Sequence, residues 1–171
     1  MNFLTVPGVL DSNGAGSPGT VQSPGWDTIP RIRQAWKRPL LLKGILNPSD
    51  ARRAIELGVD GIIVSNHGGR QLDGVPATLS VLPEIRAAVG SSTTVLVDGG
   101  IRRGTDVLKA LTLGADAALI GRPYVWGLAV GGAGGVDALL KVFAEEIARD
   151  AALLGCQDIS ELDSSWGHWQ P

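Results

Sequence analysis

An internal repeat constrains the fold of this chain more than any other feature of its sequence. Residues 57–64 (LGVDGIIV) align with residues 113–120 (LGADAALI) at a spacing of 56 residues, and residues 44–45 (GI) align with residues 100–101 (GI) at the same spacing. An offset that two separate segments share indicates a duplicated unit, and each unit has room for two strand–helix pairs. The repeat therefore favours the (βα)2 building block of a (β/α)8 barrel.

Hydrophobic runs and helix-capping residues predict strands that alternate with helices. Asn47 and Pro48 are typical of a helix start, Thr105 is expected to cap a later helix, and Gly114 to end it. Strands are predicted over residues 39–43, 61–65, 94–98 and 117–120, and helices over residues 27–36, 48–57, 79–89, 105–113 and 136–154. This alternation predicts an α/β fold with a parallel sheet, of the TIM-barrel type, in which four βα units amount to half of a barrel.

Composition excludes several classes of function. With 44% hydrophobic residues, 19% charged residues and a net charge of −2, the chain offers no basic surface to a nucleic acid. Its apolar runs are short for a bilayer span, and its N-terminus lacks the pattern of a signal peptide. The single cysteine, Cys156, cannot form an internal disulfide and is expected to be a buried thiol. We therefore expect a cytoplasmic protein with no nucleic acid, membrane or metal partner.

The chain divides into three parts by composition. Residues 1–25 are rich in Gly, Ser, Pro and Asn and are predicted to form a flexible lead-in. Residues 26–162 carry the alternating strands and helices, and residues 163–171 form a tail.

Polar residues follow each predicted strand, at the edge where parallel barrels keep their chemistry. His67 and Arg70 lie in the glycine-rich loop after the second strand. An imidazole can remove a proton near neutral pH, and a guanidinium can hold a planar carboxylate through two hydrogen bonds. The pair therefore suits an enzyme that acts beside a carboxylate.

The loops after the last two strands are expected to bind a phosphate. Gly99, Gly100 and Gly121 let backbone N–H groups approach an anion closely, while Arg102 and Arg122 supply forked donors.

Two further charged residues end predicted strands. Lys43 ends an apolar strand and needs an anionic partner, which a cofactor that gains negative charge on reduction would provide. Asp98 is expected either to accept hydrogen bonds from ligand hydroxyls or to pair with a neighbouring arginine.

These motifs resemble those of the FMN-dependent 2-hydroxy-acid oxidases and dehydrogenases, the group of glycolate, lactate and mandelate oxidases. The similarity covers residues 26–162, and its most specific part is the His/Gly/Gly/Arg/Gln loop. The matching segments are residues 42–44 (LKG), 65–73 (SNHGGRQLD), 98–104 (DGGIRRG) and 120–123 (IGRP).

The resemblance implies FMN as cofactor and a role for each matching residue. His67 would be the base that takes a proton from the 2-hydroxy acid, either from the α-carbon or from the hydroxyl, and Arg70 would bind the carboxylate. The cofactor-binding residues would be Lys43 near flavin N1 and O2, Ser65 beside the flavin, Asp98 on the ribityl chain, and Gly99, Gly100, Arg102, Gly121 and Arg122 around the phosphate.

The chain also departs from that family. The family's first four strands supply further flavin contacts, substrate-binding tyrosines and an Asp that orients the catalytic His; none has a counterpart here, and the only tyrosine, Tyr124, follows the last predicted strand. Residues 3–24 resemble the variable loop after the family's fourth strand. The resemblance therefore implies the C-terminal half of the barrel, with the last four βα units only.

We expect FMN-dependent oxidation of a 2-hydroxy acid to a 2-oxo acid, requiring the missing half of the barrel. The expected partners are a small 2-hydroxy acid and either a second copy of the chain or a complementary N-terminal half. The alternatives are a truncated, non-catalytic remnant and an interaction protein that pairs through its open sheet edges.

Overall fold

The computed structural model describes residues 25–167. The predicted lead-in falls almost wholly outside these residues, as does the end of the predicted tail. The elements, in chain order, are α1 (Thr28–Ala35), β1 (Leu41–Ile45), α2 (Pro48–Glu56), β2 (Gly61–Val64), η1 (His67–Gly69), α3 (Thr78–Val89), β3 (Thr94–Val97), α4 (Gly104–Thr112), β4 (Ala117–Ala118), α5 (Arg122–Leu154), η2 (Ile159–Glu161) and η3 (Ser164–Trp166).

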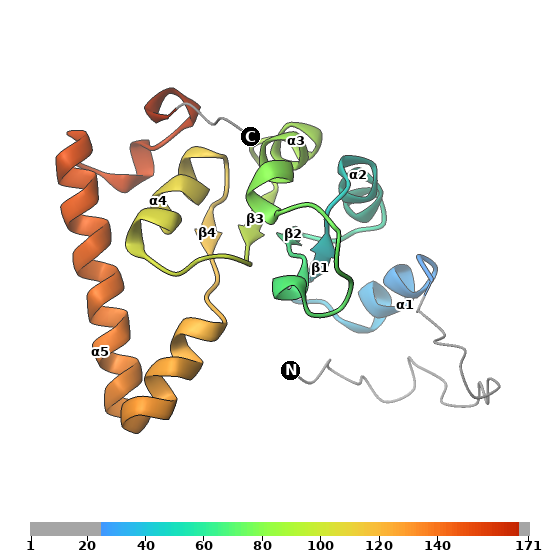
Figure 1. Ribbon diagram of the computed structural model, residues 1–171. Helices are drawn as coiled ribbons and strands as arrows, with labels where there is room; N and C mark the ends of the chain where they lie inside the picture. The colour runs from blue at the N-terminus through green and yellow to red at the C-terminus, as the bar shows by residue number, and fades with distance from the viewer. Residues whose placement is uncertain (1–24, 168–171) are drawn as a thin grey trace.

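The four strands form one parallel sheet in the order β1-β2-β3-β4, which confirms the predicted α/β alternation. Figure 1 shows α1 beyond the β1 end of the sheet and α5 beside α4 at the β4 end. Because all strands run the same way, the loops after them leave from one edge of the sheet.

The core lies between the sheet and the helices that connect its strands. Ile62 and Val64 of β2 and Val95 and Val97 of β3 are fully buried, together with Leu82 of α3. A buried side chain of this kind contributes roughly 1.5–3 kcal/mol relative to an exposed one. The two central strands therefore anchor the sheet from which the loops project.

The sequence repeat appears in the structure as a repeated contact. Asp60, just before β2, accepts hydrogen bonds from the Leu40 backbone and from Arg33, both at 2.7 Å. Asp116, just before β4, accepts equivalent bonds from the Val95 backbone and from the arginine of α3, also at 2.7 Å. Each carboxylate thus links the start of one strand to the strand before it. The two linked pairs are β1 with β2 and β3 with β4.

Strand boundaries differ from the predictions at both edges of the sheet. β1 begins at Leu41 rather than Pro39, because proline has no N–H to donate to a ladder and the Leu40 N–H donates to the Asp60 side chain. It continues to Ile45 because Gly44, at a φ of 99°, allows a bulge in the register after Lys43. β4 covers only Ala117–Ala118, because the chain soon turns at Gly121 into α5.

The start of α4 also differs from its prediction. Thr105 does not cap the helix; its hydroxyl donates to Asp150 of α5 at 2.5 Å. Asp106 instead reaches back from the first turn and accepts a hydrogen bond from the Arg103 backbone at 3.0 Å. The carboxylate is the stronger acceptor for the free N–H groups of a helix start.

Helix α5 begins at Arg122, well before the predicted residue 136. The sequence predicts no helix over residues 122–135, whereas the structure has two helical segments joined by a kink at Gly131 and Gly132. Gly132 has a φ of 58° and a ψ of −142°, a conformation that is essentially restricted to glycine. By length and composition alone α5 would suffice to cross a bilayer, since the mean hydropathy of an 18-residue window within it reaches 1.4. The kink at Gly131 and Gly132 divides it into shorter segments.

Candidate cofactor- and substrate-binding site

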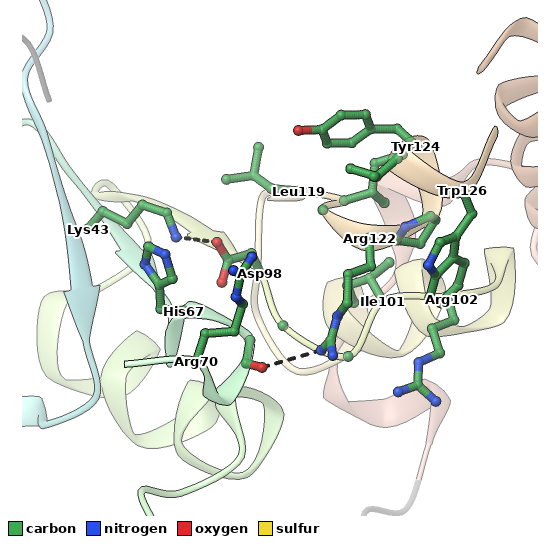
Figure 2. Close-up of a pocket in the computed structure, with 17 residues that line it drawn as sticks. Lys43, His67, Arg70, Asp98, Ile101, Arg102, Leu119, Arg122, Tyr124 and Trp126 are labelled. Atoms are coloured by element: carbon green, nitrogen blue, oxygen red, sulfur yellow. Dashed lines mark hydrogen bonds and ion pairs between the residues drawn. The ribbon is translucent and has the colours of Figure 1, made fainter. Parts of the chain in front are cut away.

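A pocket of about 390 Å³ opens at the carboxyl edge of the sheet. Lys43 of β1 and residues of the loops after β2, β3 and β4 line it. In Figure 2, Lys43, His67, Arg70 and Asp98 gather on one side of the pocket, and Arg102 and Trp126 lie on the other.

An ion pair joins the first three strands at this pocket. The Lys43 ammonium donates to the Ser65 hydroxyl at 2.6 Å and also bonds the Asp98 carboxylate. The anionic partner expected for Lys43 is therefore Asp98 of the chain itself, and Asp98 pairs with this lysine rather than with an arginine. Its second oxygen, Oδ1, is buried and has no hydrogen-bond partner among the described residues. That oxygen remains available to a ligand hydroxyl.

The loop after β2 holds His67 in an unusual backbone conformation. His67 has a φ of 55°, and Gly68 and Gly69 follow at 66° and 72°. The Ser65 hydroxyl accepts the His67 N–H at 3.1 Å, and the Asn66 side chain accepts the Gly68 N–H at 3.0 Å. Positive φ is rare for a residue with a Cβ and is found disproportionately at functional sites. Two short-range hydrogen bonds thus fix the backbone that carries the imidazole.

Ser65 does not line the pocket but supports it. The residue is 3% exposed, and its hydroxyl contacts both the Lys43 ammonium and the His67 backbone. Ser65 therefore couples the ion pair to the histidine loop.

The glycines of the last two loops leave open space beside the pocket. A Cβ on Gly100 or Gly121 would have no neighbour within 4 Å. Gly99, at a φ of 93°, packs against the histidine loop, because a Cβ there would lie 2.9 Å from the Asn66 side-chain oxygen. Backbone N–H groups at such positions can approach an anion closely.

Two arginines and the start of α5 add positive potential to the same region. Arg122 donates to the Gly68 carbonyl at 3.3 Å, which links α5 to the histidine loop. Gly121 precedes the helix and provides no side-chain cap, so the N–H groups of the first turn of α5, apart from Pro123, which has none, are not capped by a side chain. Arg102 also lines the pocket.

The structure thus brings the residues predicted from sequence to one place. All of them line the pocket except Ser65, which lies behind it: Lys43, His67, Arg70, Asp98, Gly99, Gly100, Arg102, Gly121 and Arg122.

Sequence reasoning missed the apolar wall of the pocket, formed by Leu119, Tyr124, Val125 and Trp126. The sequence does contain an uncharged run over residues 123–136, which could have indicated an apolar surface next to the last strand.

The donor set suits a ligand that carries both hydroxyls and a phosphate. An unpartnered buried carboxylate oxygen on Asp98 matches a hydroxyl donor, and two guanidinium groups with open glycines match a phosphate. FMN has both groups, on its ribityl chain, so these residues fit it.

Comparison with known proteins agrees with this chemistry. The family model described as FMN-dependent dehydrogenase matches residues 11–168. The chain is 52% identical over 143 residues to the L-lactate oxidase of Nostoc sp., covering 84% of this chain and 39% of that protein. It is 52% identical over 140 residues to 2-hydroxyacid oxidase 1 of Homo sapiens, covering 82% and 38%.

Solved structures show the same partial overlap. A mandelate oxidase with (S)-2-phenylpropionate has a TM-score of 0.78 and 50% identity, covering 80% of this chain and 41% of that one. The monotopic membrane protein (S)-mandelate dehydrogenase has a TM-score of 0.81 and 44% identity, covering 83% and 38%. The chain spans about two fifths of the length of these relatives.

Proposed function

The chain belongs to the FMN-dependent dehydrogenase family, and from that premise we propose that its pocket serves the oxidation of a 2-hydroxy acid to a 2-oxo acid. The family uses FMN as its cofactor, and its barrel contains the four βα units of this chain as its C-terminal portion. The substrate proposal draws on relatives named for lactate, mandelate and 2-hydroxy acids.

In this proposal the cofactor lies along the carboxyl edge of the sheet. Asp98 Oδ1 accepts a ribityl hydroxyl, and the Lys43 ammonium, beside Ser65, faces the flavin ring. The phosphate binds to Arg102, Arg122 and the glycines 99, 100 and 121. Bound FMN supplies a two-electron acceptor.

His67 and Arg70 act on the substrate. Oxidation of a 2-hydroxy acid releases two electrons and two protons, and the His67 imidazole accepts one of these protons. Arg70 holds the carboxylate through two hydrogen bonds, which orients the substrate toward His67. The Ser65 hydroxyl accepts the His67 N–H and so fixes the backbone that carries the base.

The observation that carries this proposal is the convergence of two kinds of chemistry in one pocket. A histidine and an arginine suited to a 2-hydroxy acid lie beside glycine and arginine loops suited to a phosphate. The histidine and arginine alone, or the phosphate-binding loops alone, would not distinguish an oxidoreductase from a simple phosphate-binding protein.

The test is flavin reduction without oxygen in an FMN-loaded assembly of this chain with a complementary N-terminal half of the barrel. Glycolate, lactate and mandelate are added separately, and the loss of flavin absorbance is followed. We expect at least one substrate to reduce the parent, and His67→Gln to be about 10²–10⁴-fold slower while it keeps its FMN. Leu72→Ala, in the same loop but outside the pocket, is the control and should keep the parent rate. His67→Gln reacting at the parent rate would contradict the assignment.

A second candidate function is association through the open edges of the sheet. Among the described strands, β1 and β4 each pair on one side only, and α5 exposes Trp126, Leu128 and Val130. Such surfaces favour pairing with a second copy or with a complementary half of the barrel. A concentration series in size-exclusion chromatography distinguishes this candidate, because it expects a larger species at higher concentration.

The proposed location is the cytoplasm. Cys156 is the one cysteine of the chain, and as a free thiol it is 5% exposed. A protein without disulfides suits a reducing compartment.

A further inference from the structure

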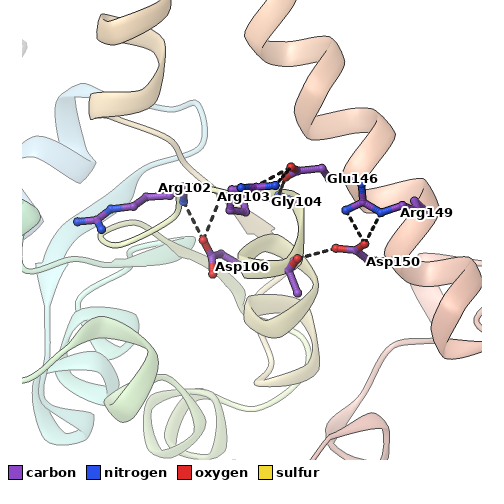
Figure 3. A network of polar contacts seen from close by, with 8 residues as sticks. Arg102, Arg103, Gly104, Asp106, Glu146, Arg149 and Asp150 are labelled. Carbon is purple, nitrogen blue, oxygen red and sulfur yellow. Dashed lines mark hydrogen bonds and ion pairs between the residues drawn. The ribbon is translucent and has the colours of Figure 1, made fainter.

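The buried carboxylate of Glu146, in α5, accepts hydrogen bonds from the end of the loop after β3 (Figure 3). The Glu146 side chain is 6% exposed. One of its oxygens accepts the Gly104 N–H at 2.8 Å, and the other accepts from the Arg103 guanidinium, at 2.8 Å from Nε and 2.5 Å from Nη2. Hydrogen bonds and an ion pair of this kind offset the free-energy cost of burying a charged carboxylate.

Close packing of the two helices makes this contact rigid. A Cβ on Gly104 would lie 2.5 Å from the Glu146 Cβ and 2.6 Å from the Ile147 backbone nitrogen. These are distances that real Cβ atoms do not show, so only glycine allows α4 to meet α5 here. The carboxylate therefore reaches the Gly104 N–H from a fixed position.

A second carboxylate fixes the two preceding residues. Asp106 Oδ2 accepts the N–H groups of Arg102 at 2.9 Å and of Arg103 at 3.0 Å. Three successive backbone N–H groups are thus bound to carboxylates of the chain, and none is free for a ligand. Their role is to hold the loop in shape.

This arrangement separates two adjacent arginines. Arg102 lines the pocket, whereas Arg103 does not line it and instead pairs with Glu146. The Arg103 hydrogen bond, followed by that of Gly104, holds the pKa of Glu146 below its ordinary value, so the carboxylate stays charged at neutral pH.

We propose that Glu146, acting through Arg103 and Gly104, is a positioning residue that sets the affinity of the pocket for the phosphate of FMN. It keeps Gly99, Gly100 and Arg102 facing the anion, although it lies on a different helix and touches no ligand. The inference rests on the proposed FMN site, and its test separates the two.

The test compares two substitutions on the same face of α5. Glu146→Gln keeps the shape of the side chain but removes its charge. Asp150→Asn is the matched control, because Asp150 also joins α4 to α5, through the Thr105 hydroxyl at 2.5 Å, yet makes no bond to the loop. The full-length chain is titrated with FMN and, separately, with inorganic phosphate, and the amide resonances of Gly100 and Gly121 report the dissociation constants. The melting temperature of each variant is measured in parallel.

We expect Glu146→Gln to raise both dissociation constants about tenfold, by analogy with the loss seen when the hydrogen-bond partner of a metal ligand is removed. Asp150→Asn should keep the parent constants even if its melting temperature falls. The inference is overturned if Glu146→Gln binds like the parent, or if Asp150→Asn weakens binding equally, which would leave Glu146 with a purely structural role.

Two further outcomes concern a Glu146→Gln variant that does not fold and a parent chain that binds neither ligand. If Glu146→Gln does not fold, Arg103→Ala replaces it, since that side chain is 68% exposed and its loss should weaken binding in the same direction. Arg103→Ala binding like the parent would again overturn the inference. A parent chain that shows no saturable shift with either ligand would contradict the phosphate site itself, and the inference with it.

Discussion

His67 occupies a backbone conformation that costs free energy. A residue with a Cβ at a φ of 55° is strained by about 1–3 kcal/mol, and the structure around it must supply that amount. The hydrogen bond from the His67 N–H to the Ser65 hydroxyl is one contact that offsets this cost. A strained residue that lines the pocket is consistent with a catalytic rather than a structural role.

Replacing His67 with glycine should therefore stabilise the fold. Relief of strain outweighs the added entropy of the unfolded chain, so we expect His67→Gly to raise the free energy of unfolding by about 1 kcal/mol. Urea denaturation measures this change. Leu72→Gly is the control, because Leu72 lies in the same loop without a positive φ and its replacement should not stabilise. Equal shifts in both variants would show that His67 is unstrained.

Sequence reasoning located the pocket residues because they lie in short motifs directly after strands. It did not find the partner of Lys43, since that lysine and Asp98 are adjacent only once β1, β2 and β3 are paired. Glu146 was missed for the same reason, because nothing near it in the sequence indicates a contact with Gly104.

At the scale of helices and strands, the contact between α4 and α5 depends on one small residue. Because a Cβ on Gly104 would meet backbone as well as side-chain atoms, the helices must separate to accept it. The loop after β3 enters α4 at this residue, so the contact also determines where that loop lies.

Gly104→Ala should therefore lower the free energy of unfolding by about 1–3 kcal/mol, the usual cost of overpacking. Gly134→Ala is the control: a Cβ there has no neighbour within 4 Å, and alanine in a helix is favoured over glycine by up to about 1 kcal/mol. Chemical denaturation of both variants provides the comparison. An unchanged midpoint for Gly104→Ala would contradict the tight packing.

Element types were predicted well, whereas some boundaries were not. Strand–helix alternation follows from local hydrophobic pattern and capping residues, and these are present in each unit. The early start of α5 was missed because its glycines favour loops locally, whereas the structure has a helix there with mostly exposed side chains.

At the scale of the whole molecule, the two linked strand pairs, β1 with β2 and β3 with β4, have the loops that line the pocket at one edge of the sheet. The contacts of Asp60 and Asp116 lie before β2 and β4, at the opposite edge. The contacts that stabilise the sheet and the residues of the candidate site thus lie at opposite ends of the strands, as in other α/β barrels. The repeat in the sequence predicted the two paired units, whereas the exposed apolar surface of α5 emerged only from the structure.

The central claim, that this edge of the sheet is an FMN site, is tested most directly by comparing FMN with riboflavin, which lacks the phosphate. Both are titrated into the full-length chain and followed by flavin fluorescence, and the ratio of their dissociation constants is measured. Charge-assisted hydrogen bonds to the phosphate should favour FMN by about 10- to 100-fold, and Arg122→Ala should remove most of that preference. Equal binding of the two flavins by the parent, or an undiminished preference in Arg122→Ala, would contradict the account.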